Sequence, residues 1–118
     1  LKFGGKLNKE NRWVQLAGLI PWWKVEEVYA KGFEKKIKGR QAVSVRMALG
    51  ALIIQERLGA SDRETVQQIT ENSYLQYFIG LPGFKEEPPF HHSLMTHFRK
   101  RLNGKAINQI NRLFSVNP

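Results

Sequence analysis

The stretch VRMALGALIIQERL, residues 45–58, constrains the fold more than any other part of the chain. Its apolar residues would cover nearly the whole circumference of a helix: Val45, Met47, Ala48, Leu49, Ala51, Leu52, Ile53, Ile54 and Leu58. A helix that is apolar on every side is normally the buried centre of a bundle. At 14 residues it is too short to span a bilayer. We therefore expect an all-α domain around this helix, begun by Ser44 and ended by Gly59.

Helical apolar spacing predicts further helices on both sides of the central one. They are expected over residues 12–19, from Trp22 onward, and over 62–71, 74–79, 93–102 and the stretch after Gly104. Ser61 and Glu64 form a capping box for the helix at 62, and Ser73 is expected to cap the next one. Residues 1–8 are predicted to be a loose lead-in. The whole chain, 1–118, is interpreted as one compact, multi-helix domain.

The charge of the chain indicates its class of partner. The net charge is +9, and no acidic residue follows Glu87. Such a balance favours a polyanion, nucleic acid before a membrane surface. No segment has the length and hydrophobicity of a membrane span, and no secretory leader is apparent. The absence of cysteine suits a reducing cytoplasm. A basic surface that is merely solvated is the alternative interpretation of the charge.

The predicted helix 93–102 separates apolar from polar side chains when it is drawn as a wheel. One stripe holds Leu94, Met95, Phe98 and Leu102, and the opposite side holds Ser93, Thr96, His97 and Lys100. Arg99 and Arg101 lie on the two flanks. A helix in a major groove needs this division, because groups at its centre reach base edges and cations at its edges neutralise phosphates. We therefore interpret 93–102 as the helix that reads double-stranded DNA.

Two other elements are expected to assist DNA binding. The pair 62–71 and 74–79 resembles a helix-turn-helix, but its outward residues are Gln, Glu and Tyr, so it is interpreted as a support for the reading helix. The loop KKIKGRQ, residues 35–41, would clamp phosphates through Lys36, Lys38 and Arg40 if it folds onto the same face.

Catalytic and metal chemistry are not expected in this chain. Asp62 is the single aspartate, and no third carboxylate is spaced to join Glu64 and Glu71 on a magnesium ion. His91 and His92 are adjacent and would not easily face one metal, so they are placed at the entrance of the basic helix. The aromatic residues lie at core spacings, with Trp23 expected to be partly exposed. No cofactor is predicted.

Several runs together resemble one family. They are LNKENRWVQLAGLIPW at 7–22, GRQAVSVRMALGALIIQERLGASDRETVQQITEN at 39–72, YLQYFIGL at 74–81 and EEPPFHHSLMTHFRKRL at 86–102. They are similar to the N-terminal domain of bacterial insertion-sequence transposases of the InsH type, in the DDE class. The resemblance implies a helical domain that binds terminal inverted repeats, helps to pair protomers and precedes a catalytic RNase H-like domain. None of the three catalytic carboxylates of that family can be placed in this chain.

The family's FRKRL run assigns DNA contacts to Arg99, Lys100 and Arg101, with Ser93 at the helix start. One departure from the family pattern concerns that start, where an aspartate usually stands at the position of His91. Histidine is a poor cap, so Ser93 is the alternative cap of a shorter helix. The sequence thus predicts a non-catalytic, sequence-specific DNA-binding module of a transposase. The alternative is a self-association module that acts through exposed aromatics around Trp23 and Tyr77.

Overall fold

The computed structural model describes residues 2–29 and 43–102, and within these ranges every regular element is a helix. The helices are α1 (Arg12–Leu19), α2 (Trp22–Tyr29), α3 (Val45–Leu58), α4 (Asp62–Glu71), α5 (Ser73–Phe78) and α6 (Leu94–Arg101). The predicted all-α class is confirmed, and the bounds of the predicted helices agree with these to within one residue at each end. The expected basic loop at 35–41 and the expected last helix after Gly104 lie outside the described residues.

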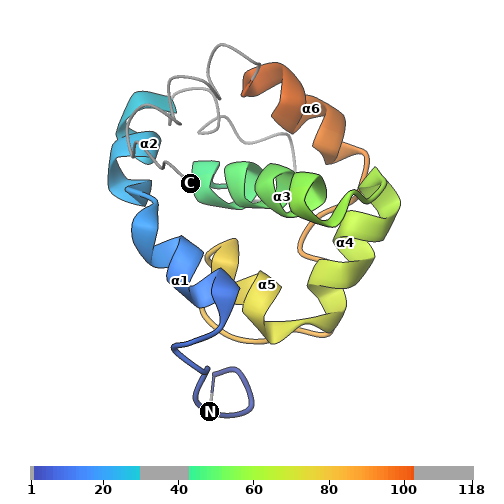
Figure 1. Cartoon of the computed structure of the whole chain (residues 1–118). Coiled ribbons are helices and arrows are strands. Elements are labelled where there is room, and N and C mark those ends of the chain that lie inside the picture. Colours follow the sequence, from blue (N-terminus) through green and yellow to red (C-terminus); the bar gives the residue numbers. More distant parts are fainter. Residues whose placement is uncertain (1, 30–42, 103–118) are drawn as a thin grey trace.

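The central position predicted for α3 is confirmed. This helix packs against α2, α4, α5 and α6, while α1 packs against α5. Figure 1 shows α3 across the middle of the molecule, with α6 on one side of it and α1 and α5 on the other. Ala48, Leu49, Ala51 and Ile54 of α3 are at most 1% exposed. The apolar circumference of α3 is thus the reason that the other helices surround it.

A glycine stands at the close contact between α3 and the end of α5. A Cβ atom at Gly50 would lie 3.1 Å from Ile79 Cγ2 and 3.3 Å from Ile79 Cα, so Ile79 would have to shift by a few tenths of an ångström to accept a larger residue there. Beside this contact the ring of Phe78 packs edge-on against both Trp13 and Trp22, with ring centroids 5.2 and 5.5 Å apart. The core therefore joins α1, α2, α3 and α5 through one phenyl ring.

The helix caps differ in two places from the predictions. Ser61 accepts the backbone N–H of Glu64 as expected (3.0 Å), but the Glu64 carboxylate accepts from Gln68 instead of returning to the cap. Only half of the predicted capping box exists. The cap of α5 is Asn72 and not Ser73, because the Asn72 carboxamide oxygen accepts the N–H groups of Tyr74 and Leu75. Gly59 ends α3 in the left-handed conformation (φ 62°), as expected.

The N-terminal residues contact the rest of the domain at three points. The Lys2 carbonyl accepts the backbone N–H of Phe84 (2.6 Å), and the Tyr74 hydroxyl accepts the N–H of Asn8 (3.0 Å). The ring of Phe3 packs edge-on against Tyr77. The segment from Lys2 onward thus contacts α5 and the segment that follows it.

Arg46 makes contacts that the sequence did not predict. Its Nε donates to the carbonyl of Phe78 (3.1 Å) and its Nη2 to the carbonyl of Tyr77 (3.0 Å), which lie at the end of α5. The guanidinium also lies over the Trp22 ring, 4.7 Å from its centroid. Partial burial lowers the pKa of Arg46, although an arginine keeps its charge in proteins. A cation at the carboxyl end of α5 satisfies free carbonyls and opposes the helix dipole.

Gln76 corrects the prediction that the glutamines of this region face outward. It is fully buried, and its amide donates to the carbonyls of Ile69, Thr70 and Lys85. Its Oε1 accepts the backbone N–H of Lys85 (2.9 Å). One buried side chain thus joins α4, α5 and the segment after α5, with all of its polar atoms paired. No helix among the described residues has both the length and the hydrophobicity to cross a bilayer.

The Arg46 clamp predicts a large loss of stability when it is removed. We expect Arg46→Ala to lower the free energy of unfolding by about 2–4 kcal/mol, because two hydrogen bonds from a charged donor and a cation–π contact are lost. Urea denaturation measures this change. Arg101→Ala, which removes an exposed arginine, is the matched control and should stay within about 0.5 kcal/mol of the original chain. Equal effects of the two variants would contradict a structural role for Arg46.

Candidate nucleic-acid interface

Helix α6 separates its two faces as the wheel predicts. Met95, Phe98 and Leu102 are at most 2% exposed, and Phe98 packs edge-on against the buried Phe90 at 5.0 Å. Leu94 is only partly buried. The polar residues that were predicted to contact DNA are all exposed: Ser93, Thr96, His97, Arg99, Lys100 and Arg101. We call these six residues the α6 polar face.

Arg99 differs from the other members of this face, because it is held by an ion pair. Its Nη1 and Nη2 donate to Oδ1 and Oδ2 of Asp62 at 2.8 and 2.9 Å, a two-pronged pair with the first turn of α4. Gln55 of α3 completes the group, since its Nε2 donates to the Asp62 carboxylate and its Oε1 accepts from Arg99. Three helices thus meet at Asp62, and the Arg99 guanidinium fixes α6 against α4.

Ser93 stands at the N-cap position of α6, as in the alternative prediction, but its side chain makes no capping bond to the helix. His91 instead binds the N-cap residue. Its Nδ1 atom accepts the backbone N–H of Ser93 (3.2 Å) and lies 2.8 Å from the Ser93 hydroxyl. His91 and His92 do stand at the helix entrance as predicted, where their carbonyls accept the N–H groups of Leu94 and Met95.

Arg63 adds a cation that the sequence did not predict as a site residue. It is exposed in the first turn of α4, close enough to His92 to lower the pKa of that imidazole together with desolvation, the larger cause. The described residues give Arg63, Lys100 and Arg101 no ion pair. Because Arg99 is neutralised by Asp62, these three side chains supply the free positive charge of the surface. The available signal was its position next to Asp62, which pairs with Arg99 of α6.

Other predicted site residues cannot be placed. Lys36, Lys38 and Arg40 lie outside the described residues, so a phosphate clamp from that loop stays a prediction. The imidazoles of His91 and His92 lie closer together than expected, with centroids 4.3 Å apart, yet the described part of the chain brings no third His, Cys, Asp or Glu to them.

The Asp62–Arg99 pair predicts a pH dependence of stability. The hydrogen bond from Arg99 lowers the pKa of Asp62 to about 2. A depressed pKa contributes stability above the carboxyl's unfolded value, near 3.8, and this contribution is lost as the pH falls toward 2. We expect Asp62→Asn to lower the free energy of unfolding at pH 7 by about 1 kcal/mol, since both partners are partly solvated.

Denaturation at several pH values measures this dependence. The difference between Asp62→Asn and the original chain should shrink between pH 4 and 2. Glu87→Gln, which alters an exposed carboxylate, should have no effect on stability at pH 7. A difference that stays constant down to pH 2 would contradict the role assigned to the pair.

Comparison with known proteins places the chain in a family. Residues 2–101 match the family model described as "Transposase domain (DUF772)". An uncharacterised protein of Rhizobium meliloti, ORF8 in the nfe locus, is 34% identical over 104 residues, which cover 88% of this chain and 49% of that protein. The chain therefore spans about half the length of this relative. No solved structure is significantly similar to it. Because the family model covers most of the sequence, the chain belongs to the transposase domain family DUF772.

Proposed function

We propose that this domain binds double-stranded DNA and recognises the terminal repeats of an insertion element as the non-catalytic module of a transposase. Membership of a transposase domain family supports a role in DNA transposition. The observation that carries the proposal is the exposed α6 polar face, which rests on a buried apolar face. Two hydroxyls, an imidazole and several cations lie together there, and no exposed acid interrupts α6.

The residues of this surface take different roles in the proposal. Thr96 and His97, at the centre of α6, would contact base edges in the major groove. Lys100, Arg101 and Arg63 would neutralise phosphates. Arg99 is a positioning residue, because Asp62 and Gln55 already engage both of its terminal nitrogens. Ser93 would face the backbone beside the start of α6, and Lys36, Lys38 and Arg40 are proposed to add phosphate contacts.

The proposed absence of catalysis by this domain rests on the use of its acidic side chains. Asp62, the single aspartate, is bound by Arg99 and Gln55. Glu64 and Glu71 accept hydrogen bonds from glutamines on the surface of α4. Carboxylates that cut DNA must converge on a metal ion. We therefore propose that the strand transfer chemistry of such a transposase is carried outside this domain.

Self-association is the second candidate function, and one observation favours it. Trp23 of α2 is 70% exposed and Val28 on the same helix is 49% exposed. Tyr77, the other aromatic of this hypothesis, is half-buried between Phe3 and Arg46 and is less accessible than expected. Exposed large apolar residues often mark contacts between proteins. Sedimentation of Trp23→Ser in the absence of DNA tests this candidate, which predicts that the variant no longer associates.

The DNA proposal predicts how salt controls affinity. Replacing Lys100 and Arg101 by glutamine should reduce the slope of log affinity against log salt by roughly one to two units, because each lost phosphate contact removes about 0.9. Fluorescence anisotropy with duplex DNA between roughly 50 and 200 mM salt measures the slope. Lys6→Gln with Lys9→Gln makes the matched control, since both lysines are exposed. They belong to the N-terminal segment, which lies on the side of the molecule away from α6 (Figure 1). An unchanged slope in the first variant would remove α6 from the interface.

The base-reading role predicts an effect on sequence preference instead of salt dependence. Selection of bound duplexes from a random library should enrich one motif with the original chain. Replacing Thr96 and His97 by alanine should weaken the preferred site by at least about thirtyfold and leave the salt slope unchanged, because base contacts carry roughly 1–3 kcal/mol of discrimination each. Equal weakening on all sequences would contradict base reading by these two residues.

A further inference from the structure

The segment after α5 displays an aromatic and acidic surface in a fixed conformation. Phe84, Glu86 and Glu87 are exposed, and the two carboxylates have no ion pair among the described residues. The backbone of this segment is held from both sides, since the N–H of Phe84 donates to the Lys2 carbonyl and buried Gln76 binds the N–H and the carbonyl of Lys85. A fixed conformation lowers the entropy cost of binding. We call residues 84–87 the acidic segment.

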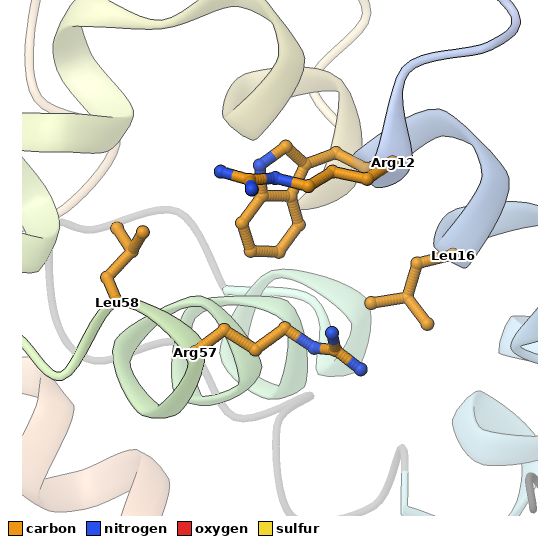
Figure 2. Close-up of a pocket in the computed structure, with 5 residues that line it drawn as sticks. Arg12, Leu16, Arg57 and Leu58 are labelled. Atoms are coloured by element: carbon orange, nitrogen blue, oxygen red, sulfur yellow. The ribbon is translucent and has the colours of Figure 1, made fainter. Parts of the chain in front are cut away.

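A hollow lined by basic side chains lies between the start of α1 and the end of α3. It encloses about 190 Å³ and is lined by Arg12, Trp13, Leu16, Arg57 and Leu58. Figure 2 shows Arg12 and Arg57 on opposite sides of it, with Leu16 and Leu58 at the other two sides. Neither arginine has an acidic partner among the described residues. Leu58 is 38% exposed at its rim. We call it the arginine hollow.

We propose that the arginine hollow of one copy binds the acidic segment of a second copy. Phe84 would enter the apolar part between Leu16 and Leu58, and Glu86 and Glu87 would pair with Arg12 and Arg57. Two copies related by a twofold axis make this contact twice, because each one presents both a hollow and a segment. Lys85 lies between these groups in the sequence, and its side chain would remain in solvent.

The chemistry of the hollow favours this occupant over others. A phosphate would pair with the arginines but would gain nothing from two leucines, whereas an aromatic side chain next to carboxylates uses both kinds of group. The volume is below the roughly 300–1,000 Å³ of small-molecule sites and suits a single side chain. The contact does not involve Trp23 or the α6 polar face, so it uses a different surface from both functions proposed above.

Charge reversal tests the contact. We expect Arg12→Glu with Arg57→Glu, and separately Glu86→Lys with Glu87→Lys, each to weaken self-association of the full chain by at least about tenfold, because like charges would then face each other. A mixture of the two variants should associate again, to within about threefold of the original chain. In a mixed pair, the acidic hollow of the first variant faces the basic segment of the second variant. The unchanged hollow of the second variant faces the unchanged segment of the first. Sedimentation over a wide range of protein concentration at low salt measures all four samples.

Control variants distinguish this contact from a general effect of surface charge. Lys9→Glu and Glu27→Lys reverse exposed charges elsewhere and should leave association unchanged. Trp23→Ser should also leave it unchanged if the hollow makes the contact, whereas the second candidate function above predicts that association is lost. A chain that stays monomeric at every concentration would overturn the proposal, and so would a mixture that fails to associate. Loss of DNA affinity and of salt slope in Arg12→Glu with Arg57→Glu, with unchanged self-association, would instead make the hollow a phosphate site. DNA binding by the original chain is measured separately, so failure of the DNA proposal is distinguishable.

Discussion

A helix that is apolar around most of its circumference has to be covered by other helices, and this constraint determines the arrangement of the domain. The covering of α3 by α2, α4, α5 and α6 follows from the hydrophobic effect. None of the short covering helices could be stable in isolation, since helices below about 12–15 residues are marginal in water. Their stability therefore comes from α3, and the position of the α6 polar face is a consequence of how α6 packs on it.

Polar side chains then fix how the covering helices are oriented. Arg46 binds the end of α5, Gln76 joins α4 to the segment beyond α5, and Asp62 joins α4 to α6. Each of them pairs groups that would otherwise be unsatisfied at a helix end or a helix junction. Apolar packing would tolerate some rotation of a short helix, whereas directional bonds at its ends do not. The surface around α6 is thus positioned by contacts that lie behind it.

The sequence was sufficient to predict the helices and which face of each helix is buried, because both depend on the spacing of residues close together in the chain. The helix bounds, the burial of Met95 and Phe98 and the exposure of Lys100 were all predicted correctly. Contacts between distant residues were missed, since nothing in the spacing pairs Arg46 with Phe78 or Asp62 with Arg99. The capping of α5 by Asn72 was also missed. Asn and Ser are equally good caps, and which of the two neighbouring residues caps α5 depends on the backbone dihedral angles where the chain passes from α4 to α5.

The start of α6 has an electrostatic consequence of its own. An aspartate at the position of His91 would accept the N–H of Ser93 equally well, but it would place a negative charge at the border of a surface whose free charges are positive. The imidazole of His91 makes this contact without a carboxylate. The start of α6 is therefore held in place without adding a negative charge that would repel a polyanion.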